Sequence, residues 1–272
     1  MIGLKSWARG RVLQGCEALS WGLAWTWWYL VPKRRDLAIE NIALALPSRP
    51  PAPLLRQMMA GLILSFFESI FHSQNGLPDL IFEGLEPVRE RVRAGKGTLL
   101  LAGHSGAWEL MVAAASREQG LPLTLIARDI AWGPARELVA KNRVDAGIEV
   151  LPPEGSVFRV LSALSEGRVV VFLLDQRHNG GIPVTFFGRD AWTSRALALV
   201  AQRSRCPVYG VWSWRNGLAR HHARVEKAFP LIGNLQRDTQ QFMRFYEEAI
   251  RAHPESWLWL HDRWRKPGRG VA

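Results

Sequence analysis

The chain has 272 residues, of which 48% are hydrophobic, and this composition excludes an intrinsically disordered protein. Its length suits one large α/β domain, or one domain with a terminal appendage. The formal net charge of +11 predicts an acidic partner, and charge alone leaves open nucleic acid, anionic lipid or an acidic protein.

The N-terminal segment is rich in tryptophan. Five of the 13 tryptophans fall within residues 7–28, among basic residues. Indole rings and basic side chains favour the interface of an anionic bilayer. Residues 18–31 carry no charge, but they are fewer than the roughly 20 residues that a helix needs to span a bilayer. We therefore expect a helix anchored at a membrane surface, with a buried core helix or a short span as alternatives.

Two further helices are predicted after this segment. The first is amphipathic, covers residues 33–46 and ends at Pro47. The second, over residues 54–71, is so apolar that it must bury most of its circumference in protein or lipid. Residues 1–80 are thus predicted to be N-terminal membrane-anchoring helices.

From residue 81 the pattern changes to an alternation of helices and apolar strands. Such an alternation predicts an α/β domain over residues 81–272, with a mostly parallel sheet flanked by helices. Functional side chains in such sheets lie at the carboxyl ends of the strands. Helices are predicted over residues 82–97, 107–120, 134–147, 156–167, 194–204 and 234–254, and strands over 98–104, 122–128, 148–152, 168–176, 207–215 and 223–229.

The turn after the strand at residues 98–104 offers two reactive side chains, of which Ser105 is one. Gly103 to Ala107 come within one methyl group of the Gly-x-Ser-x-Gly turn of serine hydrolases. Asp175 and several histidines follow in the chain order that such enzymes use. This serine-hydrolase alternative stays open, although none of these histidines lies in a supporting motif.

The other reactive side chain is His104, with Glu109 five positions later in the first turn of the next predicted helix. A carboxylate there can fold back, accept the imidazole N–H and leave the second nitrogen free as a general base. The spacing does not suggest a metal, because no His-Glu-x-x-His run or Cys/His cluster is present.

Several ordered stretches resemble one family, the late acyltransferases of lipid A biosynthesis, which are related to the glycerolipid acyltransferases. The resemblance rests on "GHSGAWEL" at residues 103–110, which is similar to the family's motif of His, four residues and Asp or Glu. It extends over most of the chain, through residues 34–47, 125–152, 173–208 and 253–266.

The resemblance implies a glycerolipid-acyltransferase-like fold with residues 81–272 as the catalytic domain. It implies transfer of a fatty acyl chain from acyl carrier protein, or from acyl-CoA, to a hydroxyl of a lipid A precursor or related glycolipid. Another phospholipid or glycolipid acceptor is the alternative. No cofactor and no metal are implied, and the expected location is the cytoplasmic face of the cell inner membrane.

The resemblance also implies roles for particular residues. His104 is the expected general base and Glu109 its orienting partner. Backbone amides around Gly106 and at the start of the following helix are expected to stabilise the oxyanion, with Arg128 as a charged partner. Three further residues are expected at the substrate: Asp175 and Gln176 in a positioning or structural role, and Phe187 along the acyl path or in the core.

A basic nucleic-acid-binding module is the alternative from another class. It would use the same arginines and aromatic residues. However, the sequence contains no recognised nucleic-acid motif, and such a module would leave the apolar N-terminal helices without a purpose. We therefore expect an anionic membrane surface and an acidic carrier protein as partners, and no nucleic acid.

Overall fold

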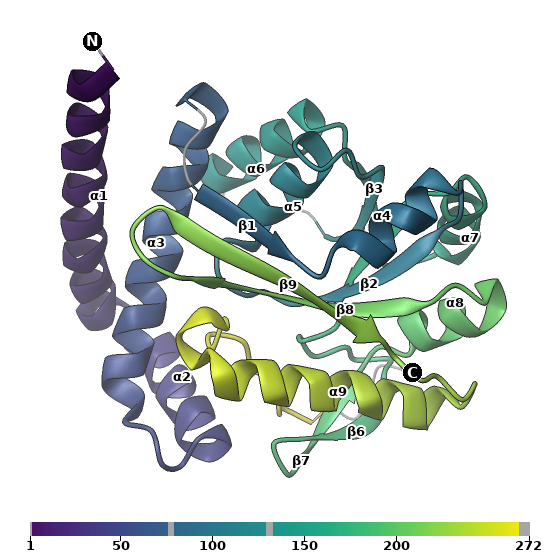
Figure 1. The fold of residues 1–272 in the computed structure, drawn as a ribbon. Coiled ribbons are helices and arrows are strands. Elements are labelled where there is room, and N and C mark those ends of the chain that lie inside the picture. The colour runs from purple at the N-terminus through teal and green to yellow at the C-terminus, as the bar shows by residue number, and fades with distance from the viewer. Residues whose placement is uncertain (1, 76–78, 129–132, 267–272) are drawn as a thin grey trace.

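Seven strands form the central sheet of the protein, which we describe from a computed structural model covering residues 2–75, 79–128 and 133–266 (Figure 1). The strand order is β1-β9-β8-β2-β5-β3-β4, and every neighbouring pair is parallel except β8 and β9. The expected α/β class with a mostly parallel sheet is therefore confirmed. The strands are β1 (Asp79–Glu83), β2 (Thr98–Ala102), β3 (Leu123–Ile126), β4 (Glu149–Leu151), β5 (Val169–Leu173), β8 (Val208–Arg215) and β9 (Arg220–Ala228).

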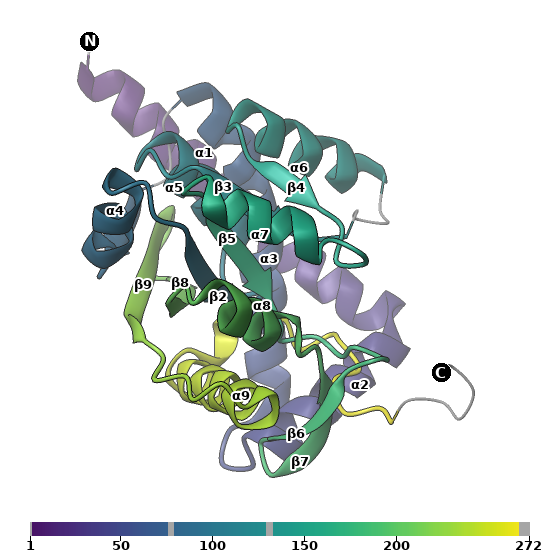
Figure 2. The ribbon, with the colours of Figure 1, turned by 90° about the vertical axis from the view of Figure 1, so that its right-hand side faces the viewer.

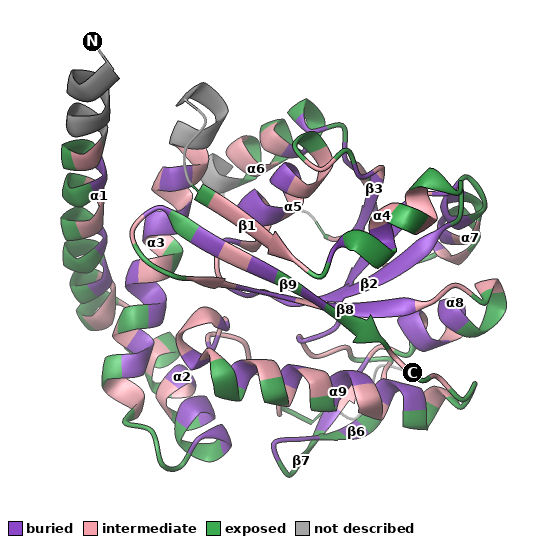
Figure 3. Ribbon diagram, in the orientation of Figure 1, coloured by how far each residue is buried: buried purple, intermediate pink, exposed green. Residues whose placement is uncertain are grey.

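Helices cover both faces of the sheet, because side chains that alternate along each strand point to opposite faces. In β2, Leu99 and Leu101 pack into one core and Leu100 and Ala102 into another. Figure 3 shows β2 buried over its length. The helices are α1 (Ile2–Leu30), α2 (Pro32–Ala45), α3 (Pro51–Asn75), α4 (Glu86–Arg93), α5 (Trp108–Arg117), α6 (Gly133–Asp145), α7 (Val157–Ser165), α8 (Ala196–Ser204) and α9 (Leu235–Ala252), with a short 3₁₀ turn η1 (Pro254–Ser256).

The N-terminal helices form where the sequence predicts them. Helix α1 lies at the edge of the molecule beside α3 (Figure 1) and exposes many large apolar side chains. Within the described residues, none of the helices combines the length and the apolar character that crossing a bilayer requires. The expected membrane association of residues 1–80, and the domain boundary at residue 80, remain predictions.

Two strand regions differ from the prediction. Residues 79–83 form β1, although the predicted helix began at residue 82. Gly84 explains the difference, because its φ of +68° ends the strand and a Cβ there would lie 2.2 Å from the Val225 carbonyl oxygen. The helix therefore begins later, at Glu86.

The second difference is an unpredicted hairpin of β6 (Ile182–Phe186) and β7 (Arg189–Thr193). Phe187 and Gly188 form its two-residue turn with φ values of +51° and +73°, as a tight hairpin of this kind requires. The hairpin lies near α2 and α9, away from the central sheet (Figures 1 and 2).

Candidate active site

His104 lies just beyond the end of β2, at the carboxyl edge of the sheet. Its backbone N–H donates to Asp175 Oδ2 at 2.9 Å, and its ring Nδ1 lies 2.9 Å from Asp175 Oδ1. A carboxylate accepts hydrogen bonds, so this contact places the imidazole proton on Nδ1 and leaves Nε2 as a free base. The side chain is 21% exposed, which is enough to reach a substrate.

Asp175 follows β5, the strand beside β2, and is almost completely buried. Its Oδ2 also accepts the indole N–H of Trp257 at 2.9 Å. Burial raises the pKa of Asp175, but the charge and hydrogen bonds of His104 outweigh it and lower that pKa to about 2. Burial conversely lowers the pKa of His104, but the charge of Asp175 outweighs this effect and the pKa is raised. The two groups therefore behave as a coupled acid–base pair.

Glu109 does not make the expected hydrogen bond to His104. Its carboxylate is instead held by Arg143, with Nη2 2.5 Å from Oε1 and Nε 3.1 Å from Oε2. The reason is geometric: Glu109 is in the first turn of α5, next to α6, which carries Arg143. Burial raises the pKa of Glu109 even though Arg143 opposes it, and the carboxylate acts on His104 only through its charge. Asp175 occupies the orienting position that the sequence assigned to Glu109.

Ser105 is buried, and its hydroxyl contacts Ser213 on β8. Its hydroxyl accepts the backbone N–H of Ser213 at 3.3 Å, and its carbonyl accepts the Ser213 hydroxyl at 2.6 Å. A serine nucleophile needs a base within hydrogen-bond reach. Among the described residues, the printed contacts of the Ser105 hydroxyl are with Ser213 on β8 and with no histidine, and Asp175 pairs with His104 instead of with one of the later histidines, so the geometry disfavours the serine-hydrolase alternative.

The two residues expected at the oxyanion, Gly106 and Arg128, both have other partners. Gly106 has a φ of +54°, and its backbone N–H is already bonded to the Ser256 carbonyl at 2.8 Å. The Arg128 side chain is 69% exposed and pairs with Glu154, at a strand end separated from β2 by β5. Each donor thus already has a partner, and the roles of Gly106 and Arg128 at the oxyanion stay predictions.

The remaining predicted residues have mixed outcomes. Gln176 is half-buried directly after Asp175, at the edge where it was expected. Phe187 is a turn residue whose N–H donates to Glu247 Oε1 at 2.7 Å and whose ring packs under Arg251. Its side chain is 8% exposed and belongs to the main hydrophobic core, which is one of the two expected places for it, while a place along the acyl path stays a prediction.

A cavity of about 210 Å³ with a mixed polar and apolar lining, called the polar cavity below, opens beside His104. One wall is α3, which the sequence did not place at the site. The lining comprises Gln57, Met58, Gly61, Leu62, Ser65, His104, Gly106, Trp108, Arg215, Gly217, Glu255, Ser256 and Leu258.

A smaller apolar cavity of about 60 Å³ lies under the same turn. Ser105 and Trp108 line it, together with aliphatic side chains that include Leu100, Met111 and Val112. Trp108 borders both cavities, and its ring lies edge-on to His104 with the centroids 5.2 Å apart. The imidazole therefore stands beside a polar space and close to an apolar one.

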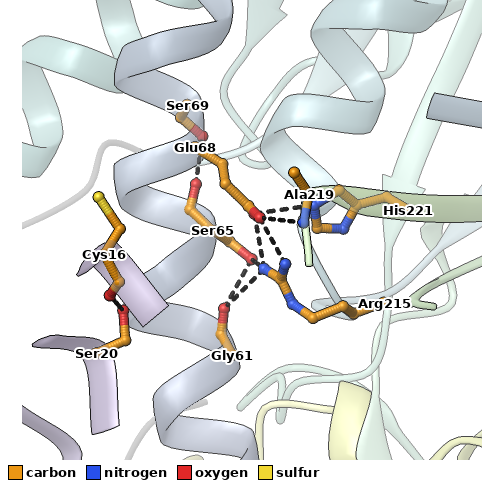
Figure 4. A network of polar contacts seen from close by, with 9 residues as sticks. All are labelled: Cys16, Ser20, Gly61, Ser65, Glu68, Ser69, Arg215, Ala219 and His221. Carbon is orange, nitrogen blue, oxygen red and sulfur yellow. Dashed lines mark hydrogen bonds and ion pairs between the residues drawn. The ribbon is translucent and has the colours of Figure 1, made fainter. Parts of the chain in front are cut away.

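Helix α3 is fixed to the sheet by a buried ionic network (Figure 4). Glu68 on α3 is only 1% exposed and accepts both Nη atoms of Arg215, at 2.6 and 2.7 Å. It also lies 2.9 Å from His221 Nε2, and Arg215 donates to Ser65 Oγ at 2.9 Å. Because Arg215 and Ser65 line the polar cavity, this network sets the position of one cavity wall.

Comparison with known proteins agrees with the motifs in the sequence. Residues 15–266 match the family described as bacterial lipid A biosynthesis acyltransferase. A phosphatidylinositol mannoside acyltransferase of Mycobacterium tuberculosis H37Rv is 25% identical over 191 residues, covering 68% of this chain and 60% of that relative. A protein of the same name from Mycolicibacterium smegmatis is 24% identical over 176 residues, covering 63% of this chain and 58% of that relative. The matched region thus spans less than two thirds of either relative. Since the family match extends over most of the sequence and includes the turn at His104, the chain belongs to the bacterial lipid A biosynthesis acyltransferase family.

Proposed function

We propose that the protein transfers a fatty acyl group from a thioester to a hydroxyl of a glycolipid, with His104 as the general base. The observation that carries this proposal is the His104–Asp175 pair at the border of a polar cavity. The pair fixes the imidazole tautomer, so that Nε2 is the nitrogen available to remove a proton.

The chemistry follows from this arrangement. Nε2 of His104 takes the proton of the acceptor hydroxyl while the hydroxyl oxygen attacks the thioester carbonyl carbon. The tetrahedral oxyanion then collapses, the C–S bond breaks, and the imidazolium returns its proton to the thiolate. Base catalysis of this kind contributes roughly 10²–10⁴-fold, and the Asp175 carboxylate stabilises the imidazolium between the two steps. The proposed donors to the oxyanion are the backbone N–H groups in the first turn of α5. This helix begins at Trp108, close to His104 in the chain.

The proposed donor is acyl carrier protein, or coenzyme A, bearing the acyl chain. The net charge of +11 supports an acidic carrier. The apolar cavity next to Ser105 and Trp108 supports a site for part of the alkyl chain, because its lining offers almost no polar atoms.

The proposed acceptor is a lipid A precursor or a related glycolipid. The family description supports the first, and the names of the mycobacterial relatives support a mannoside lipid. The polar cavity offers hydrogen-bonding groups from Ser65, Arg215 and Glu255 to a sugar. Another phospholipid acceptor is the alternative within the same chemistry.

The proposed location is the cytoplasmic face of the inner membrane, with α1 at the lipid surface. Exposed apolar side chains on α1, such as Leu19, Trp21 and Tyr29, support this placement. Arg56 of α3 lies over the rings of Trp25 and Trp28, with distances of 4.7 and 5.0 Å to their centroids. Basic and aromatic groups are thereby combined on the surface that would meet anionic lipid.

Acyl transfer from radiolabelled acyl carrier protein tests the proposal, with membranes that contain the wild type or one variant. A lipid A precursor and a phosphatidylinositol mannoside serve as the acceptors. We expect transfer by the wild type and by Ser105→Ala, and none by His104→Ala. Thioester hydrolysis that depends on Ser105 and not on His104 would overturn the assignment.

A further inference from the structure

Two aromatic side chains from the C-terminal part of the chain bind the strand ends that carry His104 and Asp175. The first is Tyr246 on α9, which is completely buried. Its hydroxyl donates to the carbonyl of Ala102 at 2.5 Å and accepts the N–H of Leu174 at 3.1 Å. One hydroxyl thus connects the end of β2 to the residue before Asp175.

The second side chain is Trp257, directly after η1, which is also buried. Its indole N–H donates to Asp175 Oδ2, the same oxygen that accepts the backbone N–H of His104. With Oδ2 engaged twice, the carboxylate cannot rotate freely, and Oδ1 stays directed at the imidazole Nδ1 at 2.9 Å. Trp257 therefore fixes the orientation of the carboxylate.

We infer that Tyr246 and Trp257 are positioning residues: Tyr246 sets the distance between His104 and Asp175, and Trp257 fixes the orientation of the carboxylate and stabilises its charge. The catalytic meaning of the pair rests on the proposed function, whereas the positioning itself is a property of the fold.

The two contacts have opposite electrostatic consequences for His104. The indole N–H stabilises the negative charge of Asp175, so its removal leaves a more basic carboxylate that holds the imidazolium proton more tightly. Loss of the Tyr246 hydroxyl instead frees the two strand ends to separate, which weakens the hold of Asp175 on that proton. A general loss of stability would not produce shifts of opposite sign.

Other charged groups surround the imidazole and remain in place in both variants. They are Glu109 on α5, Arg143 on α6, Arg215 on β8, Glu255 in η1 and His261 in the C-terminal segment, with Arg263 close to Asp175.

Histidine NMR on the full chain in detergent micelles tests the inference without needing catalysis. The chain has 7 histidines, and His104→Gln identifies the His104 signal in ¹⁵N-histidine-labelled protein. We expect Trp257→Phe to raise the pKa of His104 by roughly half a unit or more, and Tyr246→Phe to lower it by a similar amount. Trp259→Phe is the matched control, because that buried indole donates to the Pro254 carbonyl and not to Asp175.

A measurement on the wild type covers the case in which a variant does not fold. The indole N–H signal of Trp257 should move as His104 titrates, while that of Trp259 should stay nearly constant. An unmoved Trp257 signal, or a His104 pKa that is the same in Trp257→Phe, Tyr246→Phe and the wild type, overturns the inference. If the shifts occur but the wild type transfers no acyl group to any acceptor tested, the proposed function fails and the positioning stands.

Discussion

Asp175→Asn is the substitution that best distinguishes the His104–Asp175 pair seen in the structure from the His104–Glu109 pair predicted by spacing. It keeps the size of the side chain and removes the negative charge next to His104. The pKa of Asp175 falls from the ordinary 3.8 to about 2, in spite of a burial effect that acts in the opposite direction. That difference corresponds to on the order of 2 kcal/mol, or a few tens of fold in an equilibrium constant, at about 1.36 kcal/mol per pKa unit. Because burial opposes the shift, the coupling between the two groups exceeds this value.

The expected result is a fall in kcat/KM of at least a few tens of fold and up to roughly 10⁴-fold, because general-base catalysis sets the upper limit. The pKa of His104 should fall as well, since the charge of Asp175 is what raises it. The acid limb of the pH–rate profile should therefore move to lower pH. Initial rates of radiolabelled acyl transfer between about pH 5 and 9 measure both effects.

Two variants serve as comparisons for Asp175→Asn. Asp190→Asn removes a carboxylate from an exposed position on β7 and should behave as the wild type. Glu109→Gln should reduce the rate less than Asp175→Asn, because Glu109 contacts Arg143 and not the imidazole. Normal kinetics for Asp175→Asn together with an inactive Glu109→Gln would refute the reasoning and favour the pair that the spacing predicted.

Three further predictions concern the surroundings of the pair. Glu68→Gln should destabilise the fold by roughly 3–5 kcal/mol in urea denaturation at neutral pH, since it leaves Arg215 partly buried without its counter-charge. Burial raises the pKa of Glu68, but hydrogen bonds from His221 and Arg215 outweigh it, so the pKa is lowered from 4.5. The ionised carboxylate thus stabilises the wild type above about pH 4.5, and this stabilisation is lost as the pH falls further. If the free energy of unfolding of Glu68→Gln fell with acid as steeply as that of the wild type, the network would be contradicted. Gly106→Ala should lower the free energy of unfolding by roughly 1–3 kcal/mol in the same assay, because φ is +54° and a Cβ would lie 3.0 Å from the Ser213 carbonyl oxygen. Gly120→Ala is the control and should cost less, because Gly120 also has a positive φ, of +66°, but open space around it. Val112→Phe should fill the apolar cavity and shift acyl-chain preference towards shorter chains, as competition between thioesters of different length would measure; an unchanged preference would place the chain elsewhere.

Local sequence was sufficient for most of the sheet and for the turn at His104. The apolar runs that became β2 and β5 are buried on both faces, and only strands in the middle of a covered sheet tolerate such runs. Such features depend on residues close together in the chain, and sequence patterns record them.

The C-terminal segment is a region where sequence patterns say little. A terminal run with arginines and tryptophans suits a solvated tail as well as a core. In the structure, Trp257, Trp259 and Arg263 are almost fully buried, and Arg263 donates to the Trp192 carbonyl at 2.9 Å. A buried arginine needs several acceptors, and these come from β7, about 70 residues earlier in the chain.

The carboxylate partner of His104 was decided by the order of the strands. β2 and β5 are parallel neighbours in which Ala102 pairs with Leu173, so the residues two positions further on, His104 and Asp175, emerge side by side. The sequence by itself determined that His104 ends a buried strand and that Asp175 follows another. Only the tertiary structure made those strands adjacent and in register, because strand order depends on how the helices pack across the whole sheet, while spacing along the chain reports only near neighbours.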